Sequence, residues 1–339
     1  MQNKQYPFLK DGEEKFFTKD ILDQAVLMTL QKKKMPLKSD IPFKMFLSAN
    51  TDASHASLCN LLSAFTGRKV TDAIVTNPEI LPVFIGGKMS RMDIKCEFDG
   101  GQMADIELQL TQAGDDQKLR ALYYASRLYS STLREGELYG SAKTVYQIFL
   151  TDYDPFGDGK FHHRAMLRLD DGSEFSDRMQ VIFFNLKVPG YRSLYDVPDG
   201  LKRAAFWCKF ISGADNMEET IKDIMDYVKS IGITDEMLTA KSAYDTIEVS
   251  AEERAWAYYL SYHRAETDYK NELMLGRQKA MAEGRAEGRV EGIAQGEAET
   301  KIANARNFLA MKVLTHEQIA KGVGLPVEKI EELARETEA

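Results

Sequence analysis

The sequence predicts an α/β core followed by an α-helical C-terminal extension. Residues 70–150 change from strand-type to helix-type and back to strand-type chemistry, with Gly-Gly pairs at 86–87 and 100–101 marking turns. Beyond Pro189-Gly190, the apolar spacing is helical almost throughout. We therefore place a domain boundary near residue 190.

The core elements follow a leader segment, residues 1–36, which closes with three lysines and Pro36. The cap-forming residues 52–54 predict a helix reaching about Phe65, where Gly67 ends it. Residues 115–133 have the apolar periodicity of an amphipathic helix. β-branched and aromatic residues predict strands at 144–150, 163–169 and 179–188. The predicted core domain spans residues 37–190.

The extension divides into three predicted parts. Residues 191–275 form a helical region, with periodic stretches at 217–231 and 251–262. Residues 276–312 form a helical stalk with a Gly/Glu repeat, and residues 313–339 form a small helical pair around Gly322-Val323-Gly324.

Composition points to a globular protein of a reducing compartment. The chain is 44% hydrophobic and 28% charged, as ordinary globular proteins are. Its three cysteines lack CxxC spacing, which argues against a disulfide framework and a zinc knuckle. We find neither a stretch of 18 apolar residues nor the apolar centre of a signal peptide. We therefore expect a cytoplasmic protein that does not enter a membrane.

The net charge of −8 gives no overall attraction to phosphate. This argues against a dedicated, tightly binding nucleic-acid protein. It does not exclude a nuclease, because a local basic groove and a bound metal offset a generally acidic surface.

Residues 91–98 and 105–110 alternate between polar and apolar side chains and predict two paired strands. Asp99-Gly100-Gly101 between them is a hairpin signal. A three-residue loop would pair Phe98 with Gln102, so that paired residue numbers sum to 200. That register places Asp93 opposite Glu107, Lys95 opposite Asp105, and Arg91 opposite Gln109, all on one polar face.

Two carboxylates directly opposite in an antiparallel pair repel each other unless a cation or proton lies between them. Magnesium suits such a pair, because it binds one or two carboxylates and keeps open positions for water and phosphate oxygen. The alternative is a solvated hairpin face on which Lys95 and Asp105 form a weak surface ion pair.

Residues 40–189 resemble the PD-(D/E)XK nuclease family transposases, also called recombination-promoting nucleases. The resemblance rests on Asp93 followed by Glu107-Leu108-Gln109, on Asp40-Ile41-Pro42-Phe43-Lys44 as the opening element, and on Arg120-x3-Tyr124 in the following helix. It implies a restriction-endonuclease-like core, a mixed sheet flanked by helices. The C-terminal helical extension agrees with members of this family.

The resemblance also implies roles for particular residues. Asp93 and Glu107 would bind Mg²⁺, with Mn²⁺ as a substitute, and Gln109 would complete the catalytic signature. Met92 stands where the signature has proline, and Gln109 stands where it has lysine. An amide hydrogen-bonds but supplies no charge, so the substitution puts the reaction rate in doubt.

Further residues are accessory candidates. Lys95 is a candidate replacement for the missing cation, Asp40 a further acidic residue, and Lys44 a phosphate contact. Each has an ordinary structural alternative: an ion pair with Asp105, a helix cap, and a lysine extending past the core edge. The candidate DNA contacts on the helix are Arg120, Tyr124 and Arg127, with solvated arginines as the alternative. His162 and His163 point to opposite faces of a strand, so we do not expect them to share a metal.

Gly284, Gly288, Gly292 and Gly296 recur every four residues and make one narrow groove on a helix. Glycine weakens an isolated helix unless another element packs closely on it, so we expect homo-oligomerisation through the C-terminal helices. The alternative is a solvated linker. The last helix is rich in glutamate, which favours a packing module over DNA recognition.

The sequence thus predicts a magnesium-dependent DNA endonuclease acting in recombination, mobile-element or defence biology. The rival hypothesis is a catalytically weak or inactive member that serves as an oligomeric nucleic-acid-binding or assembly scaffold.

Overall fold

The structure, a computed structural model, describes residues 6–9, 13–77, 84–85, 88–89, 94–110, 117–187, 194–213 and 216–338. It has two compact units, residues 1–272 and 273–339. The helix α8 (Ala251–Met311) contributes residues to both units.

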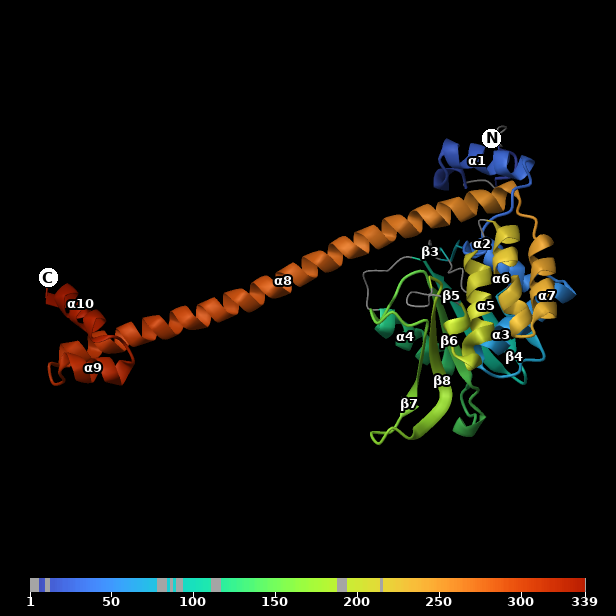
Figure 1. Ribbon diagram of the computed structural model, residues 1–339. Helices are drawn as coiled ribbons and strands as arrows, with labels where there is room; N and C mark the ends of the chain where they lie inside the picture. Colours follow the sequence, from blue (N-terminus) through green and yellow to red (C-terminus); the bar gives the residue numbers. More distant parts are fainter. Residues whose placement is uncertain are drawn as a thin grey trace. The chain divides into compact units, whose positions relative to one another are not determined.

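A six-stranded mixed sheet lies at the centre of the first unit (Figure 1). Its strand order is β1-β4-β5-β6-β8-β7. Strands β1, β4 and β5 are antiparallel neighbours, β5, β6 and β8 run parallel, and β7 returns antiparallel to β8. The bounds are β1 (Ala73–Val75), β4 (Ile94–Phe98), β5 (Gln102–Gln109), β6 (Val145–Thr151), β7 (His162–Arg168) and β8 (Glu174–Asn185). A separate two-stranded sheet pairs β2 (Phe84–Ile85) with β3 (Lys88–Met89).

The predicted hairpin register is confirmed for β4 and β5. Phe98 pairs with Gln102, and Lys95 pairs with Asp105. Gly100 and Gly101 take positive φ values of 84° and 98° in the connecting turn, where glycine carries no steric cost. Asp93 and Arg91 lie outside the described residues, so their predicted pairings with Glu107 and Gln109 stay predictions.

Helices cover both faces of the sheet, as the α/β prediction requires (Figure 1). Among the described residues, α4 (Gln117–Ser130) is the helix that packs on the face that carries Phe149, Val181 and Phe183, through Ala121 and Ala125. The opposite face, with Ile106, Ile148 and Phe184, belongs to the main core. The helices that contribute to that core are α2 (Asp40–Ser48), α3 (Asp52–Thr66), α5 (Lys202–Ser212), α6 (Met217–Ser230), α7 (Thr234–Asp245) and the start of α8.

The predicted leader contains a helix, α1 (Lys19–Leu30), preceded by the short 3₁₀ helix η1 (Glu14–Phe16). Thr18 caps α1. Phe16 and Phe17 pack against Trp256 and Tyr259 at the start of α8. Chain segments more than 230 residues apart in sequence therefore share an aromatic cluster.

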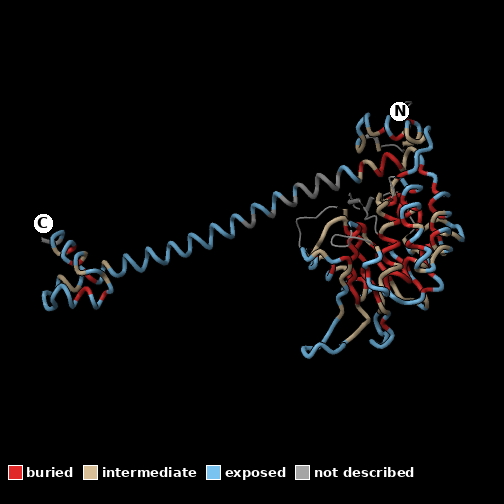
Figure 2. Tube along the Cα trace, in the orientation of Figure 1, coloured by how far each residue is buried: buried red, intermediate tan, exposed pale blue. Residues whose placement is uncertain are grey.

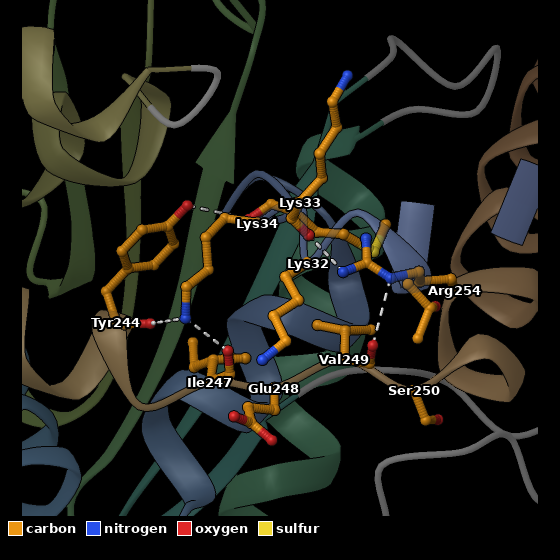
Figure 3. Close-up of a pocket in the computed structure, with 11 residues that line it drawn as sticks. Lys32, Lys33, Lys34, Tyr244, Ile247, Glu248, Val249, Ser250 and Arg254 are labelled. Atoms are coloured by element: carbon orange, nitrogen blue, oxygen red, sulfur yellow. Dashed lines mark hydrogen bonds between the residues drawn. The ribbon is translucent and has the colours of Figure 1, made fainter. Parts of the chain in front are cut away.

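Two linkers meet beside this cluster, residues 31–36 and 246–250 (Figure 3). The Lys34 ammonium donates to the carbonyls of Tyr244, Asp245 and Ile247, and desolvation lowers its pKa. The Arg254 guanidinium donates to the carbonyls of Val249 and Lys33. Together they line a cavity of about 470 Å³. We call these five hydrogen bonds the linker clamp.

The second unit has a small core of its own. It forms between the end of α8, α9 (His316–Val323) and α10 (Val327–Glu338), around Ala305, Ile319 and Ile330. A capping box between Thr315 and Gln318 starts α9, and Gly324 ends it in the left-handed conformation. Residues 280–301 of α8 are exposed throughout (Figure 2). No helix in the described part of the chain is long and apolar enough to cross a bilayer.

The remaining short elements are 3₁₀ helices. They are η2 (Tyr139–Ser141), η3 (Leu194–Asp196) and η4 (Asp199–Leu201).

Candidate active site

The predicted site centres on Glu107, in the middle of β5. Its side chain points to the α4 face of the sheet, because its neighbours Ile106 and Leu108 belong to the main core on the other face. The Arg120 Nη2 donates to the Glu107 Oε1 at 2.5 Å, and the two side chains are only 21% and 12% exposed. The Arg120 guanidinium also lies 5.4 Å from the centre of the Tyr124 ring. The first helical turns of α4 therefore hold the Glu107 carboxylate.

Further polar side chains share this face in two rows across the parallel strands. One row consists of Asp105 on β5 and Gln147 on β6, and the Gln147 Nε2 donates to the Asp105 carbonyl at 3.4 Å. The other row consists of Gln109, Thr151 and Asn185 at the carboxyl ends of β5, β6 and β8. All five side chains are buried. Because burying a polar group is costly unless it is hydrogen-bonded, these rows need partners that an apolar sheet face would not.

The structure places the other predicted residues as follows. Lys95 is exposed on β4, on the same face as Glu107. Asp40 is the first residue of α2 and not its N-cap; Ser39 occupies the N-cap position and makes no side-chain cap hydrogen bond. Lys44 is one turn further along and only 2% exposed, so its side chain is buried instead of reaching past the core edge. Asp93 lies outside the described residues.

The start of α2 lies at the end of the sheet where the row of Gln109 ends. Lys38 comes within 4.0 Å of Asp152, and the Asp152 backbone amide donates to the Gln109 carbonyl. The opening element of the sequence signature and its Glu-x-Gln element therefore approach the same edge of the sheet.

The predicted DNA contacts on α4 separate into two groups. Arg120 and Tyr124 face the sheet. Arg127 is exposed, with its guanidinium 5.8 Å from the centre of the Tyr123 ring. His162 and His163 point to opposite faces, as predicted: His162 lies against Phe184 and His163 stacks on Phe156.

Three residues of this face did not emerge from the sequence: Gln117, Gln147 and Asn185. Each is buried, and each has at least one side-chain atom without a hydrogen-bond partner in the structure. Gln147 and Asn185 do carry a signal, since each is a polar residue in an otherwise apolar strand, which is more informative than the apolar residues around it. Gln117 carries none, because a glutamine in the first turn of an amphipathic helix is unremarkable.

The side-chain oxygen atoms on this face are suitable ligands for a hard divalent cation. The Glu107 carboxylate and the amide oxygen of Gln109 are oxygen ligands of the kind that Mg²⁺ prefers. Among the described residues no group of three or more His, Cys, Asp and Glu side chains is placed to hold a metal. The second predicted carboxylate, Asp93, belongs to a segment that is not described, so the described ligand set is partial.

Comparison with known proteins identifies a family for this chain. No curated protein and no solved structure matches the chain. A family model described as PD-(D/E)XK nuclease family transposase matches residues 37–275, well over half of the sequence. The mixed six-stranded sheet flanked by helices agrees with the PD-(D/E)XK fold. The chain therefore belongs to the PD-(D/E)XK nuclease family transposases.

Proposed function

We propose that this protein is a metal-dependent DNA endonuclease that hydrolyses phosphodiester bonds at the α4 face of the sheet. The observation that carries the proposal is the placement of Glu107. Its carboxylate is held at a fixed position by Arg120, with Gln109 two residues further along the same strand face. The family membership supports a nuclease, and the reaction itself is our proposal.

In this mechanism Glu107 and Asp93 would hold the divalent cation, Mg²⁺ or Mn²⁺. The cation would supply Lewis acidity toward the phosphate and lower the pKa of a bound water. The Gln109 amide would orient the attacking water by hydrogen bonding. Arg120 would fix the rotamer of Glu107 and contribute positive charge beside the phosphate, a charge that Gln109, at the lysine position of the family signature, does not supply.

A second candidate function is an assembly or nucleic-acid-binding scaffold with little or no catalysis. One observation favours it: the Glu107 carboxylate already has an arginine partner, which competes with a metal ion for the same oxygen. Cytoplasmic location and oligomerisation through α8 are predictions in both cases. The glycines at 284, 288, 292 and 296 have open space around them within the described chain, so a second copy has room to approach.

The deciding experiment is cleavage of supercoiled plasmid by purified protein with Mg²⁺ or Mn²⁺. Asp93→Ala and Glu107→Ala should each abolish cutting. Glu97→Ala is the matched control, because it removes an exposed carboxylate from the same strand as Lys95, at a position that pairs with Met103 rather than with a residue of the site. Metal-dependent cutting by the wild type and by Glu97→Ala alone supports the nuclease. Equal cutting by all four proteins, or none by the wild type, supports the scaffold.

A further inference from the structure

Gln117, the first residue of α4, has a buried side chain whose hydrogen-bonding capacity is unused. It is 7% exposed, and neither its Oε1 nor its Nε2 has a hydrogen-bond partner among the residues that the structure describes. Burying an amide without partners costs free energy, so such groups are rare in native proteins. An amide with both ends open points to a ligand or water.

The direction of α4 shows where this amide lies. Near the start of the helix, the Lys118 ammonium is 4.8 Å from the ring centre of Phe156, which follows β6. Later in the helix, the Ser126 hydroxyl lies 4.0 Å from the Met179 sulfur, in the first half of β8. The helix therefore runs antiparallel to β6 and β8. Its first residue, Gln117, lies toward their carboxyl ends.

Those carboxyl ends carry the row of Gln109, Thr151 and Asn185. Asn185 is 2% exposed, and its Oδ1 accepts from the Lys187 backbone amide, which fixes the orientation of the side-chain amide. Within the described part of the chain, the Nδ2 of Asn185 has no partner. A second buried amide with an open donor thus lies at the end of the sheet that Gln117 covers.

Arg120 adds another open donor one helical turn from Gln117, on the same side of α4. Its Nη2 binds Glu107, whereas its buried Nε has no partner among the residues described. At this end of the sheet, the unpaired N–H donors of the described residues are therefore the Gln117 Nε2, the Asn185 Nδ2 and the Arg120 Nε. The Gln117 Oε1 is the unpaired acceptor that accompanies them.

This donor set selects the chemistry of the ligand. Three N–H groups, one of them on a guanidinium, favour an anionic oxygen over a cation as their own partner. The single acceptor suits a water molecule that donates to it. A phosphate oxygen with an adjacent water satisfies both requirements.

We propose that Gln117 and Asn185 form a binding site for a phosphate oxygen of the nucleic acid substrate, beside Glu107. The Gln117 amide donates to the phosphate through Nε2 and accepts from the adjacent water through Oε1, so it aligns the two reactants. This inference rests on the proposed nuclease function, whose substrate contacts it specifies. The competing explanation is a pair of structural waters that satisfy these amides permanently.

The two explanations predict opposite effects of Gln117→Met, which keeps the length of the side chain and removes its amide. If the amide awaits a substrate, Gln117→Met leaves the urea midpoint unchanged or higher, because it removes an unsatisfied buried group. The affinity for DNA then falls by about tenfold, the effect of one lost hydrogen bond to a charged group. If the amide binds structural water, the urea midpoint falls and DNA affinity is unchanged.

The experiment measures fluorescence anisotropy of a fluorescein-labelled DNA duplex with the full-length protein in EDTA, where metal-dependent cutting cannot occur. Urea unfolding is measured on the same samples. The matched control is Gln102→Met, at the other end of β5, where the glutamine also has a buried oxygen without a partner. Asn185→Leu is the second variant, in case one substitution alone disturbs folding.

The expected result is weaker DNA binding by Gln117→Met and Asn185→Leu, wild-type binding by Gln102→Met, and undiminished stability of Gln117→Met. Wild-type affinity in both site variants, or no DNA binding by the wild type, overturns the inference. Plasmid cutting tests the nuclease separately. If the wild type cuts plasmid and Gln117→Met binds DNA normally, only the phosphate site is refuted. If the wild type binds DNA through Gln117 but does not cut plasmid, only the nuclease is refuted.

Discussion

The ion pair between Glu107 and Arg120 permits a quantitative test of the site that requires neither metal nor DNA. At a charge separation of roughly 4 Å and an effective dielectric constant near 20, the Coulomb attraction is about 4 kcal/mol. Desolvation and side-chain entropy oppose it, and the pair is partly exposed, at 12% and 21%. We therefore expect a net coupling of about 1–2 kcal/mol.

The measurement is a double-mutant cycle of Glu107→Gln, Arg120→Gln and the double variant, by urea unfolding at neutral pH. Each substitution should cost more stability in the wild type than in the protein that already carries the other substitution. The reason is that the first substitution leaves one charge beside a neutral partner, and the second removes that charge. The coupling should decline only slightly in 1 M NaCl, because salt screens partly buried pairs weakly. A coupling below about 0.3 kcal/mol, within the usual error of additivity, would refute the view that Arg120 holds Glu107.

Three further predictions concern stability, each measured by chemical unfolding. Burial lowers the pKa of His162 to about 4, so on acidification the unfolded chain binds this proton before the folded protein does. About 2 kcal/mol of stability should therefore be lost between pH 6.5 and 4. His162→Phe should reduce this loss of stability, and an unchanged pH dependence would contradict the assignment. Gly101→Ala should destabilise by about 1–2 kcal/mol, because φ is 98° and the new Cβ would lie 3.1 Å from the Lys143 Cε; the control Gly140→Ala, with open space, should have no effect. Lys34→Met should cost about 2 kcal/mol of stability, because it leaves the carbonyl partners of Lys34 without a donor. The control is Lys33→Met, because the Lys33 side chain has no hydrogen bond within the described residues. An equal loss of stability in both variants would argue against the linker clamp.

Local signals in the sequence were sufficient for the hairpin that carries Glu107. Asp99-Gly100-Gly101 determines the loop length, and the period of two then assigns every described side chain of β4 and β5 to its face. The strand at 179–188 was predicted less well, since β8 begins at Glu174. Its first residues are exposed and polar, so they lack the apolar pattern that identifies a buried strand.

The partners of Glu107 could not be predicted from the sequence. The amphipathic pattern of residues 115–133 predicts a helix but not which strands it covers. Strands β5, β6 and β8 become neighbours through long connections, and only this order brings Gln117, Arg120 and Asn185 to one face. Helix α1 was missed for a related reason: its buried residues are few, and part of their apolar surroundings comes from Ala255 and Tyr258, far along the chain.

The linker clamp has a mechanical consequence. Arg254, at the start of α8, donates to the Lys33 carbonyl (Figure 3). Five residues later, Lys38 lies beside Asp152, whose backbone amide donates to the carbonyl of Gln109, the last residue of β5. A tensile load on the start of α8 would therefore travel through the clamp to the edge of the sheet that carries Gln109. The family match begins at residue 37, so this load path passes through residues that lie outside it. A protein shortened to the matched residues would keep its sheet and lose the tether.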